Sequence, residues 1–128
     1  ATQQWNIRPA NNEWCATEIL CHLRDVEQEV NLQRLKRCLV EENPFIAGRT
    51  TDHWAEERDY IHQNLPAALQ QFRAHRSELL TILKSLSQQN WQRPIRHAIF
   101  GPTTLQDMVR IIADHDRLHI QQMYRTIV

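Results

Sequence analysis

Apolar residues recur every three or four positions along most of the chain, which is the spacing of an amphipathic helix. The first such stretch covers residues 14–42 and stops at Asn43-Pro44, because the residue before a proline avoids the helical region. We expect one long helix here, preceded by an irregular segment, residues 1–13, that Trp5 and Ile7 anchor to the core. The apolar stripe of this helix consists of Ile19, Leu20, Leu23, Val26, Val30, Leu35 and Leu39.

A second helical region is expected over residues 52–89, with an interruption at Pro66. The part before Pro66 is either a separate short helix or a kinked first stretch, and the part after it carries apolar residues at helical spacing. Residues 43–52 and 90–102 are expected to be irregular connectors. They contain the residues that break regular structure: Gly48, Pro94, Gly101 and Pro102.

The last helix is expected to run from Thr103 or Thr104 to Ile127, with Thr103 as its N-cap and Gln106 as the capping-box partner. The chain has only 2 glycines and no alternating β-branched runs. Three long helices and a fourth, shorter one predict an all-α fold, a helical bundle that forms one domain over residues 1–128.

Composition narrows the possible partners and the cellular compartment. Lys+Arg and Asp+Glu number 15 each, and this balance argues against nucleic acid or an anionic membrane surface as a partner. No apolar run approaches the roughly 20 residues that span a bilayer, and no signal peptide opens the sequence. The cysteines Cys15, Cys21 and Cys38 all fall in one expected helix, so a disulfide framework is not expected and a cytoplasmic location fits best.

Histidines interrupt the apolar stripe of the last helix. The row Leu105, Met108, Ile112 continues with His115 and His119, which stand one turn apart on the same side. In the first helix, His22 borders the apolar stripe in the same way. A bundle could therefore bring His22, His115 and His119 together as a three-histidine metal site with an open position. The alternative is a set of hydrogen-bonded core histidines. Neutral imidazole suits Zn, Ni, Fe and Cu alike, so the ligands do not identify the metal.

Three further residues are candidates for a role beside such a site. Glu18, one turn before His22, could orient its imidazole, and Gln122, three residues after His119, could contact a metal-bound water or bridge helices. His97 could contact substrate near the bundle mouth, or serve the structure of its loop. By contrast, solvated faces are expected for Arg34, Lys36, Arg37, Arg73 and Arg76.

Several motifs together resemble the DinB/YfiT-like superfamily of metal-binding helical bundles, and they cover most of the chain in the family's order. The most specific are an opening W-x-x-x-E-I-L-x-H-L and a closing H-D-x-x-H-x-x-Q. The matching segments are EWCATEILCHLRDVE at 13–27, WAEERDY at 54–60, FRAHRSELL at 72–80, HAIFGPTTL at 97–105 and ADHDRLHIQQ at 113–122.

The resemblance implies a four-helix bundle that holds a divalent metal through His22, His115 and His119. Characterised relatives include thiol-dependent transferases and isomerases that use bacillithiol, mycothiol or glutathione. The family usually has a full helix before the Trp motif, whereas only 13 residues precede Trp14 here. The first helix is therefore expected to be short or missing, and an exposed inner stripe would favour a homodimer.

Two functional hypotheses follow. The first is a metal-dependent enzyme acting on a small molecule, either a thiol S-transferase or a related hydrolase that uses water at the same site. The second is a non-catalytic, stress-related bundle in which the metal or the histidine cluster is structural and the surface binds a partner. DNA binding is the weakest possibility, because nothing resembles a helix-turn-helix unit.

Overall fold

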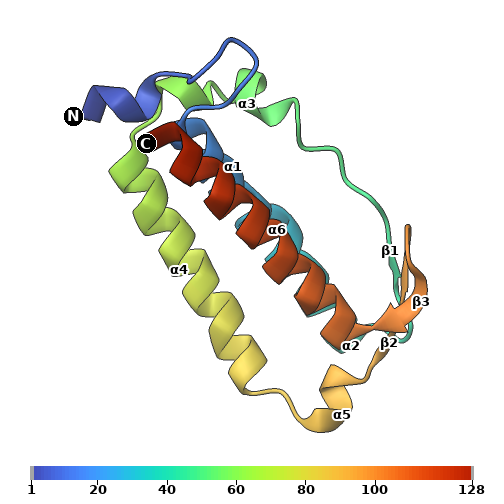
Figure 1. Cartoon of the computed structure of the whole chain (residues 1–128). Helices are drawn as coiled ribbons and strands as arrows, with labels where there is room; N and C mark the ends of the chain where they lie inside the picture. The colour runs from blue at the N-terminus through green and yellow to red at the C-terminus, as the bar shows by residue number, and fades with distance from the viewer. Residues whose placement is uncertain (1, 128) are drawn as a thin grey trace.

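A computed structural model describes residues 2–127. Three long helices dominate its fold (Figure 1). The helical elements, in chain order, are η1 (Thr2–Asn6), α1 (Ala16–Val26), η2 (Glu27–Asn31), α2 (Leu32–Val40), α3 (Trp54–Glu57), η3 (Tyr60–His62), α4 (Leu65–Lys84), α5 (Gln88–Trp91) and α6 (Leu105–Ile127). The strands are β1 (Phe45–Ile46), β2 (Pro94–His97) and β3 (Gly101–Thr104). None of the described helices is long and apolar enough to cross a membrane.

The first long helix consists of α1, η2 and α2, close to the extent that the sequence predicts. Its middle section, η2, is a π-helical turn with backbone angles continuous with those on either side. The helix begins where the Glu18 carboxylate accepts a hydrogen bond from the Cys15 backbone N–H at 3.1 Å. It ends before Asn43, which adopts a positive φ of 45°, and Pro44 prevents its continuation.

Pro66 starts a helix instead of interrupting one. The side chain of Asn64 caps α4 by accepting a hydrogen bond from the Ala67 N–H at 2.9 Å, and Pro66 lies in the first turn. Proline is tolerated there because its missing N–H would have no helical partner. The segment before it forms only short turns, α3 and η3, and α4 itself ends at Lys84.

The expected irregular connectors contain a small three-stranded sheet, so the all-α prediction holds for the bundle but not for this end of the molecule (Figure 1). The strand order is β1-β2-β3, with β1 parallel and β3 antiparallel to β2. Each strand has at most four residues, too few for an alternating pattern to stand out in the sequence. Ile46 and Ile95 anchor the sheet by burying their side chains in the core.

The N-terminus of α6 is capped by Thr104, not by the predicted Thr103. The Thr104 hydroxyl accepts a hydrogen bond from the Asp107 N–H at 3.3 Å, and both threonine hydroxyls donate to the Asp107 carboxylate. The expected partner, Gln106, instead accepts a hydrogen bond from Gln92.

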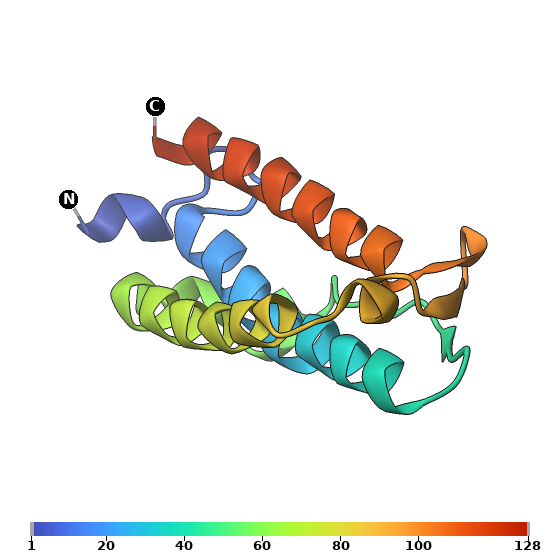
Figure 2. The ribbon, with the colours of Figure 1, turned by 90° about the horizontal axis from the view of Figure 1, so that it is seen from below.

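The first long helix is the centre of the bundle, and α1 packs against both α4 and α6 (Figures 1 and 2). One apolar cluster joins α1 to α3, η3 and α4, and a second joins α2 to the sheet, α4 and α6. The N-terminal segment is held differently from the prediction. Ile7 is 61% exposed, whereas Asn6 donates a hydrogen bond to the Ile61 carbonyl at 2.6 Å.

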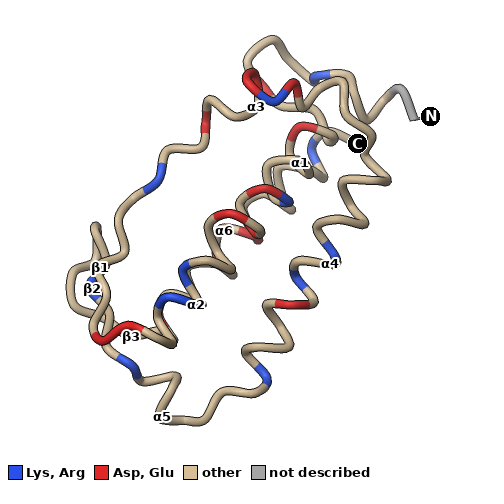
Figure 3. The backbone as a smooth tube through the Cα atoms, turned by 180° about the vertical axis from the view of Figure 1, so that it is seen from behind, with Lys and Arg blue, Asp and Glu red and all other residues tan. Residues whose placement is uncertain are grey.

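Basic and acidic residues are intermixed along the long helices (Figure 3), and one buried group of charges links all three. The Arg76 guanidinium of α4 donates to the Glu27 carboxylate of η2 and to the Asp116 carboxylate of α6, the latter at 2.7 and 3.1 Å. Glu27 is fully buried and also accepts a hydrogen bond from Asn31 at 2.8 Å. Each charge in this group is therefore paired, as burial requires.

We predict that Arg76→Met lowers the free energy of unfolding by about 3 kcal/mol, because it leaves the buried Glu27 carboxylate without its cation. Urea denaturation at pH 7 measures the change. Arg73→Met, at an exposed position one turn earlier on α4, should change stability by less than about 0.5 kcal/mol. Equal, small effects of the two substitutions would show that the ion group does not stabilise the fold.

Candidate metal centre

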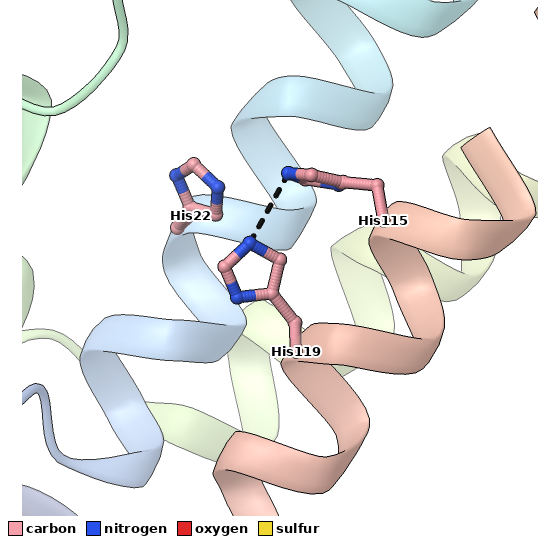
Figure 4. A group of neighbouring side chains, drawn as sticks. All are labelled: His22, His115 and His119. Atoms are coloured by element: carbon pink, nitrogen blue, oxygen red, sulfur yellow. Dashed lines mark hydrogen bonds between the residues drawn. The ribbon is translucent and has the colours of Figure 1, made fainter. Parts of the chain in front are cut away.

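The structure brings together the three histidines that the sequence singles out. His22 lies on α1, and His115 and His119 lie one turn apart on α6, facing it (Figure 4). The His22 ring centroid is 5.6 Å from that of His115 and 4.7 Å from that of His119. One ligand atom from each residue lies within 4.8 Å of the other two. Two nitrogens bound to one tetrahedral Zn²⁺ are roughly 3.3 Å apart, so a small closure would suffice for a shared ion.

Burial keeps two of the site's imidazoles, those of His22 and His115, neutral. His22 is 4% exposed, and its burial, together with the neighbouring His119 and His115 rings, lowers its pKa to about 3. Burial and then His119 also lower the pKa of His115. Neutral imidazole is the form that binds a metal, so these two ligands are available at neutral pH without loss of a proton.

Gln122 sets the tautomer of His119. Its side-chain oxygen lies 2.8 Å from His119 Nδ1, and an oxygen acceptor there places the ring proton on Nδ1. Nε2 is then the acceptor of the hydrogen bond with His115 Nε2, 3.1 Å away, and a cation would take the place of that proton. Metal-binding histidines are commonly oriented in this way by a hydrogen bond to their second nitrogen. Gln122 thus lies where the sequence places a candidate supporting residue.

Two observations fit a cation at this point. The donor set consists of three imidazole nitrogens, which suits Zn²⁺ and related divalent ions. In addition, His22 Nδ1 is buried and has no hydrogen-bond partner among the described residues. A buried polar atom without a partner is costly, and a cation bound to the ring would offset that cost. The Trp14 ring, 5.0 Å from the His22 ring, covers one side of the site.

Glu18 lies elsewhere than its spacing suggests. Its carboxylate accepts two hydrogen bonds from the Arg8 guanidinium, at 2.8 and 2.9 Å, in addition to the one from the Cys15 N–H. It therefore fastens the N-terminal segment to α1, and the structure does not bring it to His22. The reason is that Arg8, a side chain of opposite charge in the segment before α1, forms a charge-assisted hydrogen bond with the Glu18 carboxylate.

His97 lies at the end of β2, where its Nδ1 accepts hydrogen bonds from the Ile99 and Phe100 backbone N–H groups at 3.1 and 3.3 Å. The ring proton is therefore on Nε2. Burial and the nearby Arg34 guanidinium lower the pKa of His97, so the ring is a neutral hydrogen-bond donor. It supports its turn, the loop role that the sequence offers as one alternative, and it also lines the cavity described next.

A cavity of about 160 Å³ opens beside His115, between the first long helix, α6 and the sheet. Sequence reasoning missed it and placed Arg34 on a solvated face. Arg34 is instead half-buried and lines the cavity, whereas Lys36 and Arg37 are exposed. The available signal was spacing, since steps of four from His22 lead through Val26 and Val30 to Arg34.

The three cysteines are free and fully buried, as expected. Burial raises the pKa of Cys21 to about 11 and also raises the pKa of Cys15 and Cys38. A buried thiol with a raised pKa is unreactive, so these residues belong to the core.

The fold and the site define a class, the helical bundles with convergent histidines, and comparison with known proteins gives the family. The model of the DinB superfamily matches residues 1–123, and the protein belongs to that superfamily. The YfiT structure from Bacillus subtilis, described as "a probable metal-dependent hydrolase with an unusual four-helix bundle topology", superimposes with a TM-score of 0.84 at 20% identity. That match covers 98% of this chain and 72% of YfiT.

Two relatives are similar in sequence. A protein of Oceanobacillus iheyensis named "Putative metal-dependent hydrolase OB0782" is 29% identical over 109 residues, which are 84% of this chain and 61% of the relative. The uncharacterised protein YuaE of Bacillus subtilis is 22% identical over 134 residues, covering 94% of this chain and 82% of YuaE. This chain thus spans less than two thirds of the first relative's length.

Acid should destabilise the metal-free protein through His22. The folded pKa of His22 is about 3 and the unfolded value is about 6.5, so between these values the unfolded chain binds the extra proton. The free energy of unfolding therefore falls as the pH falls through this window, by about 2 kcal/mol between pH 7 and pH 5 from this one group. Urea denaturation in the presence of a chelator measures the change.

His22→Leu should remove this part of the pH dependence, whereas the exposed His62→Leu should retain it. An unchanged slope in His22→Leu would contradict the assignment of a neutral, buried His22.

Proposed function

We propose that this protein is a metal-dependent enzyme acting on a small molecule, with a divalent cation held by His22, His115 and His119. The observation that carries the proposal is the convergence of three imidazoles from two helices, with their ligand atoms within 4.8 Å of one another. The names of its relatives, two of which are described as metal-dependent hydrolases, support the same assignment.

A cation bound by three protein ligands keeps an open position, where it polarises a substrate oxygen or lowers the pKa of a bound water or thiol. The chain supplies the surroundings. Gln122 holds His119 in the required tautomer, Trp14 shields His22, and the apolar wall of the adjacent cavity limits the access of water to the reacting groups.

The proposed enzyme has two possible forms, which differ in whether the nucleophile is water or a thiol. With water the enzyme is a hydrolase, as the relatives' names suggest. With a low-molecular-weight thiol, such as bacillithiol, mycothiol or glutathione, it is an S-transferase. The buried cysteines cannot supply the thiol themselves, so a transferase would need a thiol from solution. The alternative function is a non-catalytic bundle in which the same metal is structural.

Metal titration tests the site directly. We predict that the intact protein binds one Zn²⁺ or Ni²⁺ per chain, and that His22→Ala, His115→Ala or His119→Ala each abolishes stoichiometric binding. Gln122→Leu should weaken binding by about tenfold or more, because it removes the partner of His119 Nδ1. The exposed His62→Ala serves as the matched control. Stoichiometric binding by all three histidine variants would refute the site.

Turnover separates the two forms from each other and from the structural alternative. Metal-loaded protein is incubated with activated esters and amides in the absence of thiol, and with an electrophilic aryl halide plus each thiol in turn. Dependence on water alone identifies a hydrolase, and dependence on thiol a transferase. Tight metal binding and a raised melting temperature without turnover in any arm would favour the structural role.

We also propose that two copies of the chain associate through α6. Ile120, Tyr124 and Ile127 lie at three- and four-residue spacing on one side of the helix and are each more than half exposed, which favours a covering partner. Sedimentation should show a dimer that Tyr124→Glu converts to a monomer, while Arg125→Glu, exposed on another side of α6, leaves it intact. A monomeric wild-type protein would contradict this arrangement.

A further inference from the structure

The cavity beside His115 has an apolar wall and one end lined by polar and charged side chains. Its wall is apolar, formed by Val26 and Val30 of the first long helix and by side chains of α6. His115 and Met108 both line it and stand seven residues apart, so it extends about 10 Å along α6. One end is therefore at the histidine cluster, and the other end is near the sheet.

The end near the sheet carries positive charge that the surrounding chain does not neutralise. Two guanidinium groups line it, those of Arg34 and Arg49, and no aspartate or glutamate does so among the described residues. Arg34 has no carboxylate within 4.0 Å in the described part of the chain, and its Nη2 donates only to the Ala47 carbonyl, at 2.7 Å. Burial and the proximity of Arg49 lower the pKa of Arg34, as expected for a guanidinium without a counter-ion.

Arg49 is held in place from outside the cavity. Its Nη1 donates to the Glu29 carbonyl at 2.9 Å, its guanidinium lies over the Trp54 ring at 5.1 Å, and the Glu29 carboxylate approaches no closer than 3.9 Å. The neutral His97 ring, whose proton is on Nε2, lines the same end. Thr51 and Asn31 add polar side chains there. Together these groups form a cluster of hydrogen-bond donors around two cations.

The unpaired, half-buried guanidinium of Arg34 is favourable only if an anion completes its hydrogen bonds, and the more exposed Arg49 guanidinium lines the same end of the cavity. The cavity's volume of about 160 Å³ is close to the roughly 150 Å³ that accommodates a benzene-sized molecule, and therefore limits the ligand to a few carbon atoms. We propose that this cavity binds a small carboxylic acid, with the carboxylate at Arg34 and Arg49, the apolar body along the wall, and the reacting end at the histidine cluster. The inference rests on the proposed function, because it names the substrate class of that site.

Ligand titration with labelled protein, followed by NMR, tests the inference. The probes are hexanoate and its neutral counterpart hexanamide, which have similar size and differ in charge. The wild-type protein should bind hexanoate at least about tenfold more tightly than hexanamide. Arg34→Gln should abolish this preference, since it removes the charge and the fork of donors. Arg37→Gln, which removes the same charge from an exposed position on α2, should retain it.

Arg49→Gln provides a second variant in an exposed connector, and should reduce the preference even if Arg34→Gln fails to fold. Equal affinity for hexanoate and hexanamide in the wild-type protein would overturn the inference. So would an equal loss in Arg37→Gln, or inorganic phosphate binding more tightly than hexanoate.

Titrations with chelator and with added Zn²⁺ keep this inference separate from the proposed function. A preference for the carboxylate in protein that binds no metal would support the anion site and refute the metal centre. Metal binding without any preference for the carboxylate would do the reverse.

Discussion

The Arg76 ion group is the constraint on which the geometry of the site depends. His22 and the two histidines of α6 come from different helices, so the rotation and axial position of α6 on the first long helix decide whether their nitrogens meet. Asp116 is the neighbour of His115, and Arg76 ties it to the fully buried Glu27 of η2. Paired buried charges tolerate little displacement, because either partner alone is costly. Buried polar groups can specify a packing register in this way.

The π-helical turn η2 contributes Glu27 to the Arg76 ion group. Glu27 begins the turn and Asn31 ends it, and the Asn31 amide donates to the Glu27 carboxylate at 2.8 Å. Asn31 also lines the cavity. A π turn shifts the residues that follow it around the helix axis relative to an α-helix, and such turns are frequent at functional sites. The residues that follow the turn include Arg34, whose guanidinium lines the cavity.

Periodicity predicted the long helices and the histidine faces because both depend on local spacing. The row from Leu105 through Met108 to His119 follows one face of α6 whatever lies opposite. The sheet and the cavity depend instead on contacts between distant segments. Phe45 pairs with Arg96 across some fifty residues of sequence, and Glu18 pairs with Arg8 although its spacing points to His22. Local pattern carries no information on such partners, so the sequence placed the histidines correctly on their faces but misplaced Glu18. It also placed Arg76 on a solvated face, because the partners of Arg76, Glu27 and Asp116, lie on other helices.

Charge balance links the histidine cluster to the cavity. Three imidazoles contribute no negative charge, so a divalent cation held by them would keep its full charge. Carboxylate ligands would have reduced it. The cavity adds two guanidinium groups and no acidic side chain among its lining residues. In a partly enclosed space the electric field of these positive charges would act strongly, because little solvent screens it. It would favour the deprotonated form of a bound water or thiol and would attract an anionic substrate to the same place. Neither the histidine cluster nor the lining of the cavity contains a carboxylate. The resulting positive charge would serve both the binding of an anionic substrate and the reaction at the metal.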